Sequence, residues 1–574
     1  MRQKIIPMIF CANQGFIVHS PCLRSLFATR PYSFIKHHAI NLLTCYFSCY
    51  QLLMVIDFFT YVLYNNVVVY RYPNKPKSIL RKKNMADIDE LMKVRFEKEE
   101  KAKEYGIKVR PDRFEYNYQI KDARNLEDGT KNVAVAGRLM SKRKMGKIAF
   151  LDLQDIEGHI QLVVRRDDLG EDVYKKMNEI LDIGDFIGVK GDIFTTNAGE
   201  KSIQVYEYKF LGKSYRPLPE KFHSVTDTEI LYRERHLDLI MNEDARKRFL
   251  LRSKFVRALR NYLDNHSFIE VDTPALQNTA SGATAKPFIA HHNALDMDVF
   301  LRISPELTLK KLVIGGFTNV YEIARDFRNE GMDANHLQDF TMCEGYSAYW
   351  NYEDNMKFIR EMIQSIIKEL FDGKLTVKIG EQDIDFSGEW PVVSFRDLIL
   401  KDCGIDIDRF DTAESLLNEI KNKGINLAAD NIESLGRGNL IDQLYKKVSR
   451  PNIIRPTYLI KHPTDLSPLA RSNDENPNIS DRFQLIVNGQ EIVNGYSELV
   501  DAKEQQKRLI EQSELKAKGD EEAMSYDKEY IRAMEYGMPP ISGWGLGIDR
   551  FMQFLTSSDN IRDVVLYPLM KPLN

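Results

Sequence analysis

Two arginines, Arg328 and Arg550, are candidate residues for chemistry on anions. Arg328 precedes Glu330 by two positions, and Arg550 closes a glycine-rich run that begins at Gly543. The planar guanidinium of arginine binds two oxyanions better than the point charge of a lysine does. The sequence has no GxxxxGK[ST] loop, no strand-linked GxGxxG, no zinc-ligand spacing and no GxSxG motif. It therefore does not fit the common nucleotide loops, a zinc centre or a hydrolase nucleophile elbow.

The elements that must position these residues lie in a large unit over residues 231–574. A long helix is expected over Glu243–Asn265, followed by a strand over Phe268–Val271 that ends at Thr273-Pro274. Residues 213–230 contain prolines and form the expected linker to the preceding part of the chain.

Residues 131–212 change to the two-residue period of β-strands. A helical stretch, Val173–Leu181, lies between the third and fourth of five short β-rich runs. The runs are Asn132–Met140, Ile148–Gln154, Ile160–Arg165, Asp185–Phe194 and Ser202–Leu211. This order is typical of a five-stranded OB-fold barrel, which binds single-stranded nucleic acid. On composition alone, Phe150 would be barrel core, and Gln161 and Glu200 would be surface residues.

Composition indicates an ordinary globular protein of several domains. The chain has 574 residues, of which 43% are apolar and 28% charged, and its net charge is −3. A protein that coats nucleic acid over its whole surface is excluded, but a local basic face is not. Outside the first 84 residues, Cys343 and Cys403 are the only cysteines, so the body is expected to be reduced and intracellular.

Residues 1–84 differ sharply from the rest, with eleven basic residues and one acid, Asp57. Leu42–Tyr70 could be a membrane span, although Asp57 interrupts it. Residues 1–40 are similar to a mitochondrial transit peptide. The favoured interpretation is a segment that does not belong to the mature protein, with Met85 as the true start. Residues 85–130 are then expected to open with an exposed helix from Ala86 that has ended by Gly106 and Pro111.

Three separated segments resemble, in order, the three signatures of the class II aminoacyl-tRNA synthetases. Phe268–Pro274 is similar to the first, and Gly545–Arg550 to the third. Phe327–Gly331, with His336 and Phe340 after it, is similar to the second. Each segment alone is a weak signal, whereas all three behind an OB barrel are highly specific.

Further stretches resemble the bacterial-type lysyl-tRNA synthetases, within the subgroup that also holds the aspartyl and asparaginyl enzymes. These stretches are Arg235–Ile240, Ser281–Phe288, Leu301–Leu307 and Glu491–Leu499, and the resemblance covers residues 85–574. It implies an α+β fold: a five-stranded OB barrel, then a catalytic domain with a mixed, mainly antiparallel sheet flanked by helices.

The resemblance implies ATP-dependent activation of L-lysine to lysyl-adenylate, with release of pyrophosphate, and transfer of lysine to tRNA(Lys). Its transition state gathers negative charge, which cations and Mg²⁺ stabilise. Arg328 and Arg550 match the catalytic positions: the first bridges the substrate carboxylate and the α-phosphate, and the second packs on adenine and reaches the γ-phosphate. The other positions matched to ATP binding are Glu330, His336, Phe340, which stacks on adenine, and Glu491.

The resemblance also implies a lysine pocket. Glu498 and Tyr346 match the positions for the side-chain ammonium, and Glu306 and Gly282 those for the α-amino group. A desolvated carboxylate rejects neutral analogues because it would be left unpaired. The remaining matched positions are Arg328, Glu344, Asn494, Tyr496 and Gly545. In the barrel, Phe150, Gln161 and Glu200 match the anticodon-reading positions, which reverses the interpretation from composition.

The implied cofactor is Mg²⁺, with Glu491 as a ligand. Gln484 stands where the family usually has a glutamate that helps to hold the metal. A neutral amide is a weaker ligand for a hard dication, so a weakened Mg²⁺ subsite is predicted. Two further departures are Leu337–Asp339 in place of the more common Asn-Pro-Glu, and Asp272 in place of a glutamate in the first signature.

The implied partners are tRNA(Lys), ATP, L-lysine and a second copy of the chain, because the first signature builds the subunit interface in this class. No membrane partner is expected for the body, and the location is cytoplasmic, or mitochondrial if residues 1–84 are a transit segment. One rival is an enzyme that adds lysine to a protein, although such relatives lack the OB barrel. Another is a catalytically silent RNA-binding paralogue, which should lose Arg328 or Arg550. Without the three signatures, Glu330 and Glu344 would be surface acids and Phe340 core.

Overall fold

The computed structural model describes residues 77–219, 228–427, 432–517 and 523–573. The transit-peptide and membrane-span interpretations of the N-terminal segment fall on residues 1–76, outside the described residues. Among the residues that are described, no helix is long and apolar enough to cross a membrane.

Helix α2 (Lys77–Glu104) starts earlier than the sequence pattern predicts. It begins directly after Pro76, rather than at Ala86, since neither proline nor glycine interrupts the run that follows. Its C-terminal part ends in front of Gly106, and Ala102 packs into the core of the barrel. Lys98 pairs with Asp182 at 2.5 Å, so part of the helix's charge is neutralised by the neighbouring domain.

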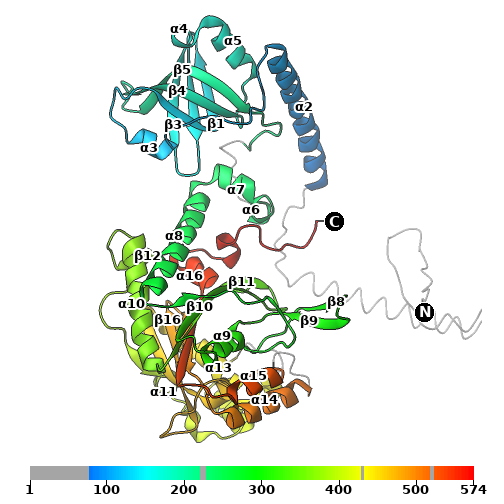
Figure 1. Ribbon diagram of the computed structural model, residues 1–574, viewed down its shortest axis with the longest axis vertical. Coiled ribbons are helices and arrows are strands. Elements are labelled where there is room, and N and C mark those ends of the chain that lie inside the picture. Colours follow the sequence, from blue (N-terminus) through cyan, green and yellow to red (C-terminus); the bar gives the residue numbers. More distant parts are fainter. Residues whose placement is uncertain (1–76, 220–227, 428–431, 518–522, 574) are drawn as a thin grey trace, which may run out of the picture. The chain divides into compact units, whose positions relative to one another are not determined.

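Five strands form a closed barrel in the order β1-β2-β3-β5-β4 (Figure 1). They are β1 (Val133–Met145), β2 (Ile148–Gln154), β3 (His159–Arg165), β4 (Phe186–Thr195) and β5 (Lys201–Gly212). Helices α4 (Arg166–Leu169) and α5 (Glu171–Ile180) lie between β3 and β4, and α3 (Ile120–Arg124) precedes the barrel. The alternation of buried and less buried residues along β2 puts Ala149, Leu151 and Leu153 inside. The predicted OB-fold is confirmed.

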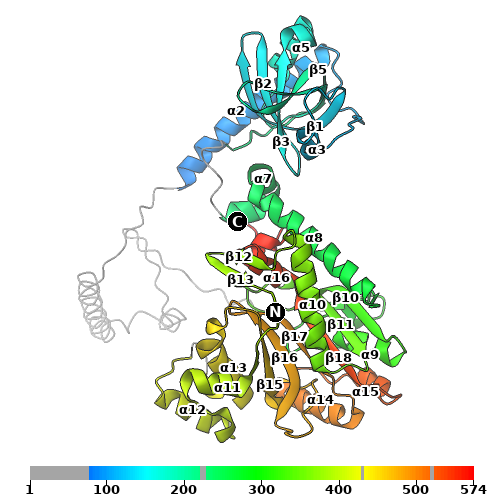
Figure 2. The same ribbon diagram turned by 90° about the vertical axis from the view of Figure 1, so that its left-hand side faces the viewer.

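The larger domain is built on an eight-stranded sheet in the order β14-β15-β16-β17-β18-β11-β10-β6 (Figure 2). Only the two outermost pairs, β14 with β15 and β6 with β10, are parallel. The strands are β6 (Ile269–Glu270), β10 (Asn319–Phe327), β11 (Asp339–Ala348), β14 (Val392–Ser394), β15 (Thr457–Pro463), β16 (Ile479–Val487), β17 (Gln490–Ser497) and β18 (Ile541–Gly547). This is the mixed, mainly antiparallel sheet that was expected.

The two faces of this sheet have different partners. Helices α8 (Glu243–Asn265), α10 (Tyr352–Leu370) and α16 (Ile548–Leu555) share one apolar core with it, which includes Tyr321, Trp544 and Leu546. Helix α9 (Glu306–Ile314) packs through Leu309 and Val313 on a separate cluster. That cluster contains Val320 and Tyr346, which lie at positions of opposite parity to Tyr321, so α9 covers the other face.

The remaining elements surround this frame. Helices α6 (Thr228–Arg233) and α7 (Arg235–Met241) precede α8, and α14 (Ala502–Ala517) and α15 (Lys528–Met534) pack near α9. Helices α11 (Phe395–Cys403), α12 (Ala413–Asn422) and α13 (Arg437–Val448) form a cluster of their own beside β15 and β16. The small sheets are β7 (Leu276–Gln277), β9 (Met297–Leu301) and β8 (Ile289–His292), and the pair β12 (Thr376–Ile379) and β13 (Gln382–Asp385).

Candidate active site

The predicted site residues share the face of the sheet that α9 covers. On β11, Phe340, Glu344 and Tyr346 are separated by even intervals, so their side chains point the same way. Across the sheet, Tyr346 is paired with Gly543 and Glu344 with Gly545. Asn494 is paired with Gly545, and Tyr496 with Gly543, on the next strand. The strand period and the strand pairing thus gather residues from three separate stretches of sequence.

The glycines of β18 keep this face open. Gly543, Gly545 and Gly547 alternate with Trp544 and Leu546, whose side chains enter the core on the opposite face. A Cβ atom on Gly543 would overlap the Tyr346 ring and Glu498 Oε1. The spacing of the glycines therefore provides room on the ligand face and anchors the strand on the other.

Three acidic side chains are buried together on this face. Glu306, Glu344 and Glu498 are all buried, and Lys310 lies among them, fully buried as well. Lys310 Nζ lies 2.5 Å from Glu306 Oε1 and also forms an ion pair with Glu498. The Tyr496 hydroxyl donates to Glu306 at 2.8 Å.

Glu344 is held by two hydroxyl groups. Ser304 Oγ donates to Glu344 Oε1 at 2.9 Å, and the Tyr346 hydroxyl donates to Glu344 Oε2 at 3.1 Å. Burial raises the pKa of Glu344 well above its usual value, and the charges of Asp326 and Glu306 add to the effect. Burial lowers the pKa of Lys310, but Glu306 and Glu498 outweigh it, and the net shift is upward. Lys310 is therefore a permanent cation inside an acidic pocket.

Arg328 borders this pocket at the end of β10. Its guanidinium carbon lies 5.0 Å from the centre of the Phe340 ring, within cation–π range. Arg328 Nε is buried and has no hydrogen-bond partner among the described residues. A buried guanidinium nitrogen without a partner is a donor available to an anionic ligand.

Asp326, two residues earlier on the same face, was not predicted from sequence. Its side chain is fully buried, and neither carboxylate oxygen has a hydrogen-bond partner in the described part of the chain. Burial raises its pKa to about 7, while Arg328 and Arg302 oppose the shift. Asp326 and Lys310 are thus two buried titratable groups that lie beside the predicted site residues and were not predicted themselves.

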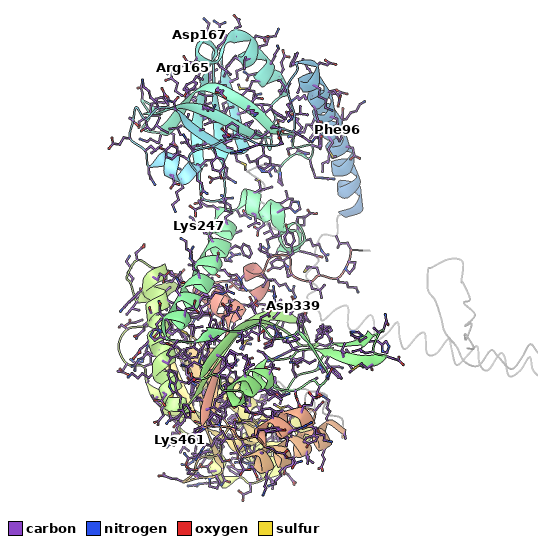
Figure 3. The ribbon with its side chains drawn as sticks, in the orientation of Figure 1. Phe96, Arg165, Asp167, Lys247, Asp339 and Lys461 are labelled. Carbon is purple, nitrogen blue, oxygen red and sulfur yellow. The ribbon has the colours of Figure 1, made fainter. Side chains whose placement is uncertain are left out.

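The loop between β10 and β11 carries the remaining residues of the second signature. Glu330 and His336 are exposed there, and a carboxylate oxygen of Asp333 lies 2.8 Å from His336 Nδ1. Asp339 opens β11 at the end of this loop (Figure 3). Glu330 and His336 are thus near Arg328 in the chain but outside the buried pocket.

Arg550 lies in the first turn of α16, which begins directly after the last glycine of β18. The preceding Asp549 fixes this turn, since its Oδ2 accepts from the backbone N–H of Thr341 at 2.7 Å. Asp549 also pairs with Arg252 of α8. Arg550, half-buried, is therefore tied to β11, the strand that bears Phe340 and Glu344.

Glu491 is the one carboxylate in a short polar chain. Gln484 Nε2 donates to Glu491 Oε2 at 2.7 Å, and Gln484 Oε1 lies 3.1 Å from His462 Nε2. Burial holds the pKa of His462 well below its usual value, so the ring is neutral. Since an amide oxygen can only accept, His462 Nε2 carries the proton. Both ends of the Gln484 amide are thus occupied within the protein.

Gly282 and Asn494 complete the predicted pocket. Gly282 has a φ of 97°, which side-chain-bearing residues rarely adopt, and a Cβ there would lie 3.5 Å from Glu306 Cβ. Asn494 Oδ1 accepts from Arg482 Nε at 2.8 Å, which leaves the amide N–H groups of Asn494 for a ligand. Arg482 was not predicted from sequence.

In the barrel, Phe150 lies on β2 and Gln161 on the neighbouring β3, and Glu200 directly precedes β5. Phe150 is half-buried and alternates with the core residues of β2, so it is not barrel core. Asp152 is paired with Gln161, and Gln161 with Ser202, which follows Glu200 by two residues. Ser202 Oγ donates to Gln161 Oε1 at 3.1 Å. Arg165, the last residue of β3, and Asp167, in α4, are labelled in Figure 3.

Sequence reasoning missed Lys310, Ser304, Asp326, Arg482 and His462. For Lys310 the signal was present, because it follows Glu306 by four residues and a helix brings such residues together. The others depend on strand pairings that a single sequence does not reveal.

Comparisons with known proteins agree with this geometry. The model of the class II tRNA synthetases (D, K and N) matches residues 227–571, and that of the OB-fold nucleic acid binding domain matches residues 133–211. The lysine–tRNA ligase of Aquifex aeolicus is 44% identical over 79% of this chain and 76% of its own length. That of Pelotomaculum thermopropionicum is 43% identical over 85% of this chain and 96% of its own length. The lysine–tRNA ligase of Escherichia coli O157:H7 is 42% identical over 85% of this chain and 98% of its own length.

These matches cover the barrel, the catalytic sheet and all three signature segments. The chain belongs to the class II tRNA synthetases, in the family of the lysine–tRNA ligases.

Proposed function

We infer that this protein is a lysine–tRNA ligase, which activates L-lysine with ATP and transfers it to tRNA(Lys). The observation that carries this inference is the buried cluster of Glu306, Glu344 and Glu498 beside Arg328. Lysine brings two ammonium groups and one carboxylate, and such a cluster complements all three. An amino acid with a neutral side chain would leave a buried carboxylate unpaired, so its binding is strongly disfavoured.

Within this pocket, each substrate group has a partner. Glu498 and Tyr346 bind the side-chain ammonium, and Glu306 and the Gly282 backbone bind the α-ammonium. The amide N–H groups of Asn494 and the hydroxyl groups of Tyr346 and Tyr496 orient the other polar atoms of the lysine substrate. Gly545 keeps space beside Glu344, since a Cβ there would lie 3.7 Å from Glu344 Cγ.

Activation is an in-line displacement at the α-phosphorus. A carboxylate oxygen of lysine forms the new bond, and the bond between the α-phosphorus and the bridging oxygen of pyrophosphate breaks. Arg328 holds the attacking carboxylate and the α-phosphate together, supported by its position over Phe340. Phe340 and Arg550 hold the two faces of adenine, and Glu330 and His336 close over the nucleotide from the loop.

Members of this family are generally dependent on ATP and Mg²⁺, and the residues present fit a metal that arrives with the nucleotide. Glu491 has an oxygen that Gln484 does not occupy, and Mg²⁺ commonly takes one or two carboxylates together with substrate phosphates. Bound there, the metal would neutralise charge on the phosphates. Gln484 does not serve as a ligand in this arrangement, because its carbonyl oxygen faces His462.

The barrel supplies selection of the tRNA. A half-exposed aromatic ring at Phe150 can stack on an unpaired base, and Gln161 and Glu200 can read base edges beside it. We place the domains at residues 85–130, 131–212 and 231–574, with a linker at 213–230.

A homodimer is the proposed assembly. Part of the first signature forms β6, which among the described residues pairs with β10 alone, and Ile269 on it is 50% exposed. The free edge and the exposed apolar side chain are a surface that a second copy can cover. The bacterial relatives favour action in the cytoplasm, with the mitochondrion as the alternative.

The test is aminoacylation of tRNA(Lys) transcripts by the full chain. We expect lysine to be attached, and Phe150→Ala to reduce kcat/KM for tRNA while leaving lysine activation unchanged. Transfer of lysine to a protein instead of tRNA would favour the rival ligase. Binding of tRNA without activation would favour the silent paralogue.

A further inference from the structure

The side chain of Lys310 lies between the two carboxylates that are proposed to bind the substrate's ammonium groups. It reaches from α9 into the pocket, its side chain is 1% exposed, and it forms ion pairs with both Glu306 and Glu498. Its Nζ also lies 6.0 Å from the centre of the Tyr346 ring and 5.6 Å from that of Tyr496. All four of these partners are residues assigned to lysine recognition.

A buried ammonium between two carboxylates has a mechanical consequence. Without it, Glu306 and Glu498 would repel each other in a medium that screens charge poorly. With it, each carboxylate is drawn to the same nitrogen, which fixes their separation. Glu306 is the partner proposed for the α-ammonium and Glu498 the one for the side-chain ammonium, so this separation spans the two ends of the substrate.

Both carboxylates keep capacity for a second cation. Glu498 Oε1 is buried and has no hydrogen-bond partner among the described residues. Glu306 Oε2 accepts from the Tyr496 hydroxyl at 2.9 Å, while Lys310 approaches Oε1. Each carboxylate therefore meets Lys310 and can still accept from substrate, so Lys310 does not have to leave when lysine binds.

We propose that Lys310 is a positioning residue that sets which diamino acid the pocket accepts, by bridging Glu306 and Glu498 and so fixing the distance between the two ammonium sites. This proposal rests on the proposed function. It assigns substrate-length selection to a residue of α9 that does not itself contact the reacting atoms. Ornithine, one methylene shorter than lysine, is the discriminating probe.

The experiment compares lysine and ornithine in ATP–pyrophosphate exchange with the full chain and its Lys310→Met variant. In the variant, the ratio of kcat/KM for lysine to that for ornithine should fall on the order of 10-fold or more, the range that one methylene provides. The KM for lysine should rise and the KM for ATP should stay unchanged. Lys310→Arg keeps the charge and should restore part of the preference.

Two further variants keep the test decisive. Lys310→Gln retains a hydrogen bond to one carboxylate and replaces the methionine variant if that one does not fold; it should show the same loss of preference. Lys311→Met, at the neighbouring position of α9, is the matched control and should leave the ratio unaltered.

Two outcomes would overturn the proposal. An equal loss with both amino acids at an unchanged ratio would make Lys310 a merely structural residue. A lower KM for lysine in Lys310→Met would show that Lys310 competes with the substrate rather than positions its partners. Absence of lysine exchange in the unmodified chain would instead refute the proposed function.

Discussion

Gly345 and Trp544 face each other across β11 and β18, and the indole of Trp544 lies where a side chain of residue 345 would be. An added Cβ would lie 2.5 Å from Trp544 Cζ2. Both residues are on the core face of the strands whose opposite face carries Glu344 and Tyr346. Packing on one face thus sets the position of the ligand-binding side chains on the other.

Gly345→Ala should destabilise the protein by about 1–3 kcal/mol, the usual cost of an overpacked core. Trp544→Leu should also destabilise it, by leaving a cavity. Combined, the two changes should cost less than their sum, because the leucine makes room for the new methyl group. Thermal unfolding of the four proteins tests this, and strict additivity would show that the two residues do not share the space.

Glu498→Gln should lower kcat/KM for lysine by roughly 100-fold, since a buried ammonium would lose its carboxylate partner. The KM for ATP should change little. Glu511→Gln, an exposed change on α14, is the control and should have no effect. ATP–pyrophosphate exchange over a range of lysine concentrations measures the result. An unchanged KM for lysine would show that Glu498 does not bind the substrate.

Asp326 makes stability depend on pH. Burial raises the pKa of Asp326 to about 7 in the folded protein, whereas the unfolded chain has the ordinary aspartate pKa of 3.8. Well below pH 3.8 both states hold the proton, so there is no penalty. As pH rises towards 7 the unfolded state loses its proton first, and folding becomes less favourable.

Asp326→Asn mimics the protonated side chain and should remove this penalty. It should stabilise the protein at pH 8 by roughly 2–4 kcal/mol, and the gain should shrink towards pH 4. Denaturant unfolding of both proteins from pH 4.5 to 8.5 measures the difference. A difference that does not vary with pH would show that Asp326 is ionised throughout.

Gln484→Glu should shift the Mg²⁺ dependence of pyrophosphate exchange to lower concentration. A second carboxylate beside Glu491 is a better ligand set for a hard dication than an amide whose oxygen faces His462. Gln382→Glu, an exposed change on β13, controls for added charge. If the Mg²⁺ concentration at half-maximal exchange were the same in all three proteins, residue 484 would have no part in binding the metal.

Much of the site could be predicted because the signatures place its residues on strands. Phe340, Glu344 and Tyr346 have even spacing, as do Asn494, Tyr496 and Glu498, and the three glycines of β18. A period of two then puts each set on one face. The long helix over Glu243–Asn265 was also predicted with its observed bounds.

The parts that could not be predicted depend on burial and register. A Glu–Lys pair four residues apart on a helix is usually a solvated surface pair, and nothing local shows that Glu306 and Lys310 lie beneath a sheet. The contact between Gln484 and Glu491 follows a register shift in the pairing of β16 and β17, and sequence does not reveal it. The predicted start of α2 at Ala86 is wrong, because the abrupt change of composition near Met85 does not coincide with a structural boundary.

ATP–pyrophosphate exchange of the full chain with lysine, aspartate and asparagine in turn tests the central claim most directly. A pocket lined by Glu306, Glu344 and Glu498 should support exchange with lysine alone, at saturating Mg²⁺. Exchange with aspartate or asparagine, or none with lysine in a folded protein, would contradict the assignment of this acidic pocket to lysine.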